Sequence, residues 1–373
     1  MADSSAGHPE LLRRLAGEIR AEGSVSFARF MEIALHDPDA GYYARGPERL
    51  GRGGDFFTAS DVGPAFGEAL ARLVTEMDDA LGRPEPFRYV EYGAGRGMLA
   101  RDVLEALPAV ASRVAADLVD ASPGMRAAAA AAVPSARVGA HLARRGGAGV
   151  VVAVELFDAL PVHRVRRRGE ALVEVRVAIE GDRLVEAERE ADAELVAAAS
   201  RYGSAPEDGD EAEVCLALPG LLASLSEAIE RGFLVVVDYG HEAELLRAPA
   251  HRRGTLLAYR RHAVTEDYLD HVGEQDLTAH VNLTHLTDEA RALGFALLRM
   301  TTQDRFLIAN GILEGLDDDS GSLAATKRRL QAKQLLHPGG MGTAFKVAVF
   351  AKSLSPAPDL KGLRDPFETV GGA

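Results

Sequence analysis

The chain has 373 residues, 47% of them hydrophobic and 26% charged, and its single cysteine, Cys215, excludes an intramolecular disulfide or a cysteine metal cluster. A formal net charge of −14 argues against a nucleic-acid partner and suits a cationic ligand. No apolar stretch is long enough to cross a membrane, and the N-terminus lacks a secretory signal, so we expect a cytoplasmic protein with no membrane partner.

The first region, 1–83, is expected to form a helical N-terminal cap. Apolar residues recur at helical spacing there, with Ser26 placed to cap the second helix and Pro38 placed to end it. A segment rich in glycine and aromatic residues, 41–61, is expected to be an ordered loop that approaches cofactor or substrate. The predicted helices cover 10–22, Ser26 to about His36, and 64–81.

From Phe87 onward, predicted strands alternate with predicted helices. Two apolar runs, 149–154 and 232–238, are typical of strands covered on both faces. The alternation predicts an α/β fold with a mainly parallel, doubly wound, Rossmann-like sheet. The predicted strands are 87–92, 116–120, 136–138, 149–154, 232–238, 295–300 and 345–351, with helices near 98–107 and at 124–132.

Two insertions interrupt this alternation. The segment 162–230 has antiparallel texture with a hairpin at Glu180-Gly181-Asp182, followed by an acidic loop at 203–213, and is expected to form a substrate-side subdomain. A further insertion spans about 240–290. The Rossmann-like domain is then split into 84–161 and 231–373. The crowded Arg164, Arg166, Arg167 and Arg168 are interpreted as a solvated turn between two strands.

The segment Glu91-Tyr92-Gly93-Ala94-Gly95-Arg96-Gly97 lies between a predicted strand and a predicted helix. Its glycines allow a tight turn and a close ligand, and the helix N-terminus offers free N–H donors. A dinucleotide loop would need glycine at position 98, where Met98 stands. The spacing therefore favours S-adenosylmethionine (SAM) over NAD, although a tight strand-to-helix connection alone would also explain such a turn.

Acidic residues follow the predicted strands at the edge where ligands of open α/β sheets bind. Asp120 is expected to accept hydrogen bonds from the ribose hydroxyls, with Ser122 beside it, and Glu91 to hold the methionine ammonium; a helix N-cap is the alternative for Asp120. Glu155 and Asp158 are candidate catalytic carboxylates, Glu155 is also a candidate cofactor contact, and for Asp158 an N-cap or surface acid is an equal alternative. A second candidate base is His280, for which a structural hydrogen bond is at least as good an explanation.

Several short motifs are distributed over nearly the whole chain: LHDPDAGYYA (35–44), GDFFTAS (54–60), EYGAGRG (91–97), ELFDALPVHRV (155–165), VVDYGH (236–241), GTLLAYRRH (254–262), QDLTAHVN (275–282) and MGTAFKV (341–347). Together, and in this order, they resemble the MidA family of SAM-dependent methyltransferases.

The resemblance implies a class I methyltransferase fold with SAM at the glycine turn. It implies SAM contacts from Gly93, Gly95 and Gly97, and places Glu155 as the acid after the fourth strand. The loop residues that the resemblance places near SAM are Gly54, Asp55, Phe56 and Thr58. The family's mitochondrial member assists respiratory complex I assembly, with symmetric dimethylation of an arginine on a respiratory subunit as the implied activity.

The chain departs from the family at Tyr92, Ala94 and Ala59-Ser60-Asp61, and lacks an asparagine before Glu155, so that subunit is not carried over as target. We expect methyl transfer to an acceptor nitrogen, most simply a protein arginine. A guanidinium is a poor nucleophile until a proton leaves, and Glu155 could align it. A small-molecule acceptor (O-, N- or C-methylation) and a non-catalytic SAM-binding assembly factor stay open, as does a homodimer. No metal site is evident.

Overall fold

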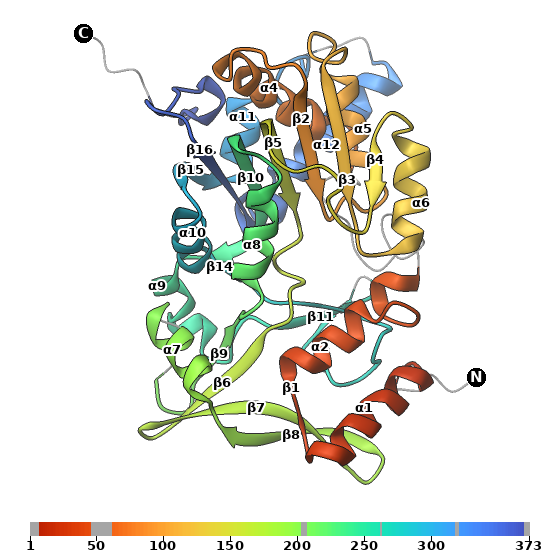
Figure 1. Cartoon of the computed structure of the whole chain (residues 1–373), viewed down its shortest axis with the longest axis vertical. Coiled ribbons are helices and arrows are strands. Elements are labelled where there is room, and N and C mark those ends of the chain that lie inside the picture. The colour runs from red at the N-terminus through yellow and green to blue at the C-terminus, as the bar shows by residue number, and fades with distance from the viewer. Residues whose placement is uncertain (1–6, 46–61, 203–206, 262, 318–320, 369–373) are drawn as a thin grey trace. The chain divides into compact units, whose positions relative to one another are not determined.

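The computed structural model describes residues 7–45, 62–202, 207–261, 263–317 and 321–368 (Figure 1). Contacts divide the chain into two units. Unit 1 comprises Met1–Phe56, Leu156–Leu222 and Gly240–Glu289; unit 2 comprises Phe57–Glu155, Ala223–Tyr239 and Ala290–Ala373. Each unit is therefore assembled from segments that are distant in the sequence.

Unit 2 contains the predicted Rossmann-like sheet, in the order β15-β16-β10-β5-β2-β3-β4. Its ladders are parallel except that β16 is antiparallel to both β10 and β15. The strands are β2 (Phe87–Tyr92), β3 (Val114–Val119), β4 (Arg137–Gly139), β5 (Ala148–Val154), β10 (Arg231–His241), β15 (Phe295–Thr302) and β16 (Phe345–Lys352). All seven predicted strands are confirmed. From β2 the chain adds β3 and β4 on one side of the sheet and then crosses to β5 on the other side of β2. Ligands of such sheets bind at this point, between β2 and β5.

Both faces of this sheet are covered, as the apolar runs predicted. Every residue of β2 is buried, and so are the five central residues of β5. Side chains such as Tyr89 and Val152 share one core with Phe66 and Leu70 of α4. The helices of unit 2 are α4 (Ala65–Ala80), α5 (Met98–Glu105), α6 (Pro123–Ala132), α11 (Gln303–Ala309), α12 (Leu323–Leu336), α13 (Met341–Ala344) and the 3-10 helix η4 (Lys361–Leu363), while α8 (Leu218–Glu227) and α10 (Leu283–Ala292) begin in unit 1.

Unit 1 contains an antiparallel sheet packed against the N-terminal helices. The sheet order is β1-β7-β6-β9, with β8 also pairing β7. Ser26 caps α2, because its hydroxyl accepts a hydrogen bond from the Arg29 amide at 3.0 Å, and the hairpin turn lies at Gly181–Asp182, as predicted. The elements are α1 (Pro9–Glu22), β1 (Val25–Ser26), α2 (Phe27–His36), η1 (Tyr42–Arg45), β6 (His163–Arg168), β7 (Ala171–Glu180), β8 (Arg183–Glu190), α7 (Ala193–Arg201) and β9 (Glu211–Val214).

The remaining part of unit 1 is a second, three-stranded antiparallel sheet in the order β12-β11-β13. A short parallel ladder joins β14 to the last two residues of β10, Gly240 and His241. The elements are α9 (Ala243–Leu246), η3 (Pro249–His251), β11 (Leu257–Arg260), β12 (Ala263–Thr265), β13 (Asp276–Thr278) and β14 (Val281–Asn282). Among the described residues, no helix is both long and apolar enough to span a bilayer.

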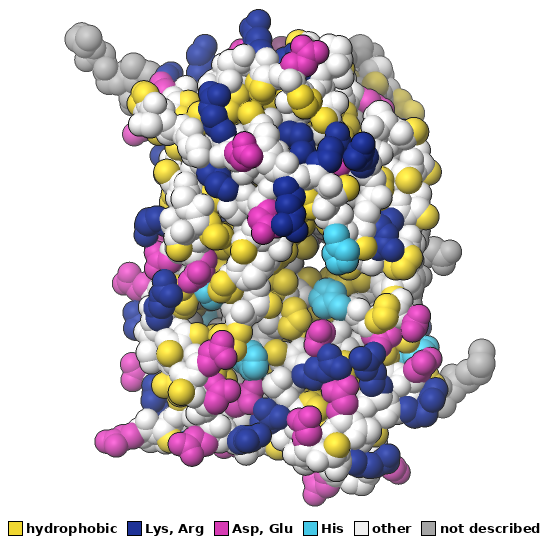
Figure 2. All heavy atoms as spheres, viewed as in Figure 1, with side chains coloured by type: hydrophobic (Ala, Val, Ile, Leu, Met, Phe, Trp, Pro, Cys, Tyr) yellow, Lys and Arg dark blue, Asp and Glu magenta, His cyan; other side chains and the backbone are white. Residues whose placement is uncertain are grey.

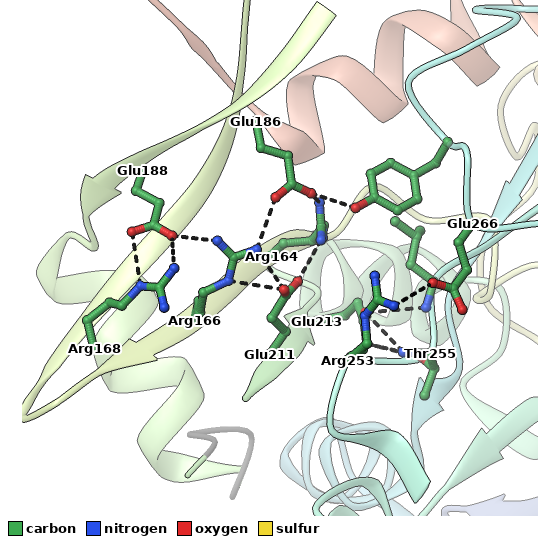
Figure 3. Close-up of polar contacts among 12 residues, drawn as sticks. Arg164, Arg166, Arg168, Glu186, Glu188, Glu211, Glu213, Arg253, Thr255 and Glu266 are labelled. Atoms are coloured by element: carbon green, nitrogen blue, oxygen red, sulfur yellow. Dashed lines mark hydrogen bonds and ion pairs between the residues drawn. The ribbon is translucent and has the colours of Figure 1, made fainter. Parts of the chain in front are cut away.

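Two sequence interpretations in unit 1 are wrong. The expected acidic loop continues into strand β9, because Glu211 to Val214 pair with β6. The expected solvated arginine turn is strand β6 itself. Alternate residues of a strand point to one face, so Arg164, Arg166 and Arg168 form a row there. Figure 3 shows how this row meets carboxylates from β8 and β9.

The arginine row forms a ladder of ion pairs. Arg164 donates to Glu186 at 2.5 Å and to Glu211 at 2.6 Å, while Arg166 also contacts both (Figure 3). Burial opposes ionisation of Glu186, but the Tyr268 hydroxyl and the arginines lower its pKa to about 2. The exposed fraction of the arginine side chain increases along this row, from 5% at Arg164 to 50% at Arg168. On the face drawn in Figure 2, charges of both signs are likewise interspersed.

This difference in exposure predicts that substitutions of Arg164 and Arg168 destabilise the protein to different extents. Arg164→Met should lower the free energy of unfolding by about 3–5 kcal/mol, because it removes the most buried cation of the row, which pairs with both Glu186 and Glu211. Arg168→Met removes an exposed pair and should leave the unfolding midpoint almost unchanged. Urea unfolding of the two variants measures the difference. Equal losses would contradict a ladder whose strength depends on burial.

Candidate functional site

The glycine turn of unit 2 follows β2 directly and is shaped by backbone hydrogen bonds. The amides of Gly93 and Ala94 both donate to the Val119 carbonyl, at 2.9 and 3.2 Å, which ties the turn to β3. Gly93, Gly95 and Gly97 have φ values of 69°, 52° and 71°, a region that L side chains disfavour. The three glycines are therefore required by the backbone path itself.

Two of these glycines face different surroundings. A Cβ built on Gly97 would lie 3.0 Å from Cα of Ala129, so this glycine allows α6 to pack closely. A Cβ built on Gly95 would meet no atom within 4 Å. Packing within the protein thus gives no reason for glycine at position 95 beyond its φ of 52°. The open space beside its backbone fits a cradle for SAM.

Asp120 joins the glycine turn to the loop after β3. Its carboxylate accepts hydrogen bonds from the Gly95 amide and the Ser122 amide, both at 2.8 Å. Burial raises the pKa of Asp120, and these two amides act against that rise. The cap of α6 is Ser122, whose hydroxyl accepts from the Met125 amide at 3.3 Å. An acceptor group therefore lies beside the cradle, where the ribose contact was predicted.

Glu91, the predicted partner of the ammonium group, is buried within unit 2. Its carboxyl accepts a hydrogen bond from the Tyr89 hydroxyl at 2.7 Å. Burial raises the pKa of Glu91 from 4.5 to about 8. A cation bound nearby would favour the ionised form, because opposite charges lower the pKa of a carboxyl.

The raised pKa makes a stability prediction. Because the folded state holds this proton more tightly than the unfolded state, the stabilisation is complete below pH 4.5 and is lost as pH rises through about 8. Glu91→Gln stays neutral and escapes this loss, which amounts to at most about 5 kcal/mol. Between pH 6 and 8, wild type should lose up to about 1.4 kcal/mol per pH unit relative to the variant. Urea unfolding of both proteins between pH 6 and 8 measures this loss. If the unfolding free energies of the two proteins run parallel with pH, the prediction is wrong.

Glu155 follows β5 on the same edge of the sheet as the glycine turn. The ladders place Ala153 beside Tyr92 and Val154 beside Val237, and the Glu155 amide donates to the Val237 carbonyl at 2.9 Å. Glu155 is half-buried and has a φ of 52°. A left-handed conformation at a non-glycine residue stores strain, which is common at functional positions.

Asp238 lies within β10, directly after the last residue that pairs with β5, and was not selected as a site residue from the sequence. It is 1% exposed, and it accepts a hydrogen bond from the Tyr239 amide at 2.9 Å. Its place directly after the apolar run of β10 was the available signal, since carboxyl ends of parallel strands meet at one edge. The edge thus carries Asp120, Glu155 and Asp238.

The other candidate catalytic residues lie in unit 1. The Asp158 side chain is buried, and its carbonyl accepts a hydrogen bond from the Ala279 amide at 3.0 Å, next to His280. The ring centroid of His280 lies 5.1 Å from that of His241 and 5.9 Å from that of His251. Gly54, Asp55, Phe56 and Thr58 lie outside the described residues.

A clamp not foreseen from the sequence holds His280 in place. The Thr255 hydroxyl accepts a hydrogen bond from the His280 amide at 2.9 Å and donates one to Glu213 at 3.1 Å. The Glu213 carboxylate also accepts from the Thr255 amide (Figure 3). A pocket of about 290 Å³ in unit 1 is lined in part by Thr255 and His280. Among the described residues, no group of three or more His, Cys, Asp or Glu is arranged to hold a metal ion.

Comparison with known proteins agrees with this geometry. A family model described as "Putative S-adenosyl-L-methionine-dependent methyltransferase" matches residues 69–301. The mitochondrial protein arginine methyltransferase NDUFAF7 homolog of Drosophila melanogaster is 29% identical, over 92% of this chain and 85% of the relative. Human NDUFAF7, named in the same way, is 28% identical, over 90% of this chain and 82% of the relative.

A solved structure is similar over almost its whole length. A Burkholderia thailandensis protein crystallised with S-adenosylhomocysteine (SAH) superposes with a TM-score of 0.86 at 30% identity, covering 95% of this chain and 94% of that one. One conclusion follows from the shared fold, from the glycine cradle with its neighbouring acid, and from the family match over more than half of the chain. The chain belongs to this family of SAM-dependent methyltransferases, the family that its motifs resemble.

Proposed function

We propose that this SAM-dependent methyltransferase transfers the methyl group to an arginine of a protein acceptor. The observation that carries the proposal is similarity over 90% or more of the chain to relatives named protein arginine methyltransferases. A small-molecule acceptor, and SAM binding without transfer, become outcomes of the test below.

Within unit 2, Gly93, Gly95 and Gly97 would hold the donor through their backbone, and Asp120 would accept hydrogen bonds from its ribose. The placement of the Asp120 carboxylate against the Gly95 amide supports this assignment. Bound SAM supplies a methyl group on a positively charged sulfur that is already activated for displacement. The protein's own contribution is therefore positioning and charge arrangement.

Glu155 is proposed to align the acceptor. A carboxylate can accept two parallel N–H bonds from a guanidinium and draw positive charge from the attacking nitrogen. Its position on the edge that carries the glycine turn supports this role. A proton must leave the guanidinium, and Glu155 is proposed to receive it. Asp158 and His280, in unit 1, stay predicted catalytic residues. Further predicted cofactor contacts are Ser122, Gly54, Asp55, Phe56 and Thr58.

Unit 1 is proposed to receive the acceptor protein, since it is built from the N-terminal helices and the insertions. The cytoplasmic location expected from the sequence stays a proposal, and the curated relatives named above are mitochondrial.

The test uses SAM with a radiolabelled methyl group, the purified full-length chain and a lysate of cells lacking it. Label in a protein band, with methylated arginine found by mass spectrometry of that band, supports the proposal. Label only in small molecules, or SAH binding by titration calorimetry without any transfer, would overturn it. Mass spectrometry also separates symmetric from asymmetric dimethylarginine.

A further inference from the structure

A cluster of aromatic and acidic side chains lies inside unit 1, and of its members only Asp158 has a part in the assignments above. The Tyr43 hydroxyl donates a hydrogen bond to Asp276 at 2.8 Å. The His36 ring stacks on the Tyr43 ring with centroids 5.6 Å apart, and Tyr42 meets Tyr43 edge-on at 5.3 Å. Tyr43 thus links a buried carboxylate to two further aromatic rings.

A second tyrosine and a second carboxylate belong to the same cluster. Tyr259 of β11 is the direct ladder partner of Asp276 of β13. Asp158 is tied to this region because its carbonyl binds the Ala279 amide, while the next carbonyl, that of Ala159, lies 3.0 Å from His36 Nε2. Burial, then the charges of both aspartates, raise the pKa of Tyr43 and of Tyr259, so both phenols stay protonated.

The cluster is assembled from four separate motif segments. Tyr43 comes from 35–44, Asp158 from 155–165, Tyr259 from 254–262 and Asp276 from 275–282. The two tyrosines are half-buried, whereas Asp276 is 2% exposed. The tyrosines therefore form the partly exposed side of the cluster, and the buried Asp276 accepts the hydrogen bond of Tyr43.

We infer that Tyr43, Tyr259, Asp158 and Asp276 recognise the guanidinium group of the acceptor, an inference that rests on the proposed function. A guanidinium is a flat, delocalised cation that lies against aromatic surfaces and offers a planar fork of N–H donors to carboxylates. An ammonium is a compact, strongly hydrated charge that loses more on entering such a site. The cluster thus selects arginine over lysine.

The experiment measures binding, separately from turnover. Full-length protein with labelled tyrosines and saturating SAH is titrated with N-acetyl-arginine amide and N-acetyl-lysine amide by NMR. The arginine compound should shift the Tyr43 and Tyr259 ring signals and bind at least about tenfold more tightly than the lysine compound. Asp276→Asn should weaken arginine binding at least about tenfold while the SAH affinity stays unchanged.

A matched control comes from the same unit. Tyr43→Phe and Tyr202→Phe each remove a phenol that donates to a carboxylate, Asp276 and Glu289 respectively. Only Tyr43→Phe should change the affinity for the arginine compound, and unchanged SAH affinity with cooperative unfolding shows that a variant is folded. Equal binding of both compounds, or equal effects of the two phenylalanine variants, would overturn the inference.

The recognition site and the proposed transfer to a protein arginine are contradicted by different results. Methylated protein arginine from the wild type, without probe shifts at Tyr43 or Tyr259, would overturn the recognition site and leave the activity standing. Probe binding at the cluster with no transfer to any protein arginine would overturn the activity instead.

Discussion

Glu155→Gln should bind SAH with wild-type affinity and transfer methyl groups at least about 100-fold more slowly, the lower range for loss of a group that handles a proton. The amide keeps the size of the side chain but carries no charge. It cannot draw positive charge from a guanidinium or accept its proton. Titration calorimetry with SAH and single-turnover assays with radiolabelled SAM measure the two quantities separately.

The matched control is Glu105→Gln, which neutralises an exposed carboxylate at the end of α5 in the same unit. It should leave both SAH affinity and turnover unchanged. Wild-type turnover in Glu155→Gln would overturn the catalytic assignment. A large loss of SAH affinity in Glu155→Gln would instead favour a cofactor-binding role, which is also among the predictions for this residue.

Gly95→Ala should fold and yet bind SAM and SAH about 10- to 100-fold more weakly. The added methyl group meets no protein atom within 4 Å, so the fold can accommodate it. Alanine at a φ of 52° should cost about 1–2 kcal/mol of stability. The same methyl group would occupy space that a ligand needs at the backbone. We therefore expect the affinity for SAM and SAH to fall by more than the loss of stability alone would cause. Titration calorimetry and urea unfolding measure both.

Gly82→Ala controls for backbone strain. Gly82 has a φ of 77°, and a Cβ there also meets nothing within 4 Å, but it lies in the turn after α4. This variant should show a similar loss of stability and no loss of SAH affinity. If Gly95→Ala binds SAH like the wild type, the ligand does not approach the turn, and the cofactor assignment fails.

Local patterns predicted the sheet of unit 2 well. Strands β5 and β10 are continuous apolar runs, and such runs occur where both faces of a strand are covered. The glycine turn could also be predicted from the sequence, because its backbone has positive φ values at Gly93, Gly95 and Gly97 that other residues disfavour.

Charged segments were interpreted less well. The arginines of β6 have the composition of an exposed turn, yet Arg164 is buried. Carboxylates from β8 and β9 neutralise it, and they lie 22 and 47 residues away in the sequence. A window of sequence contains no information about such distant partners, so a run of charges alone does not reveal whether it is solvated or paired.

By itself, the sequence determined the family, the strands of the Rossmann-like sheet and the cofactor turn, because each depends on residues that are close together in the chain. The tertiary structure alone decided which segments join. It paired β1 with β7, and it placed Tyr43 on Asp276, 233 residues away. The physical reason is that strand pairing and burial of charge depend on partners brought together by folding, and a linear pattern does not name them.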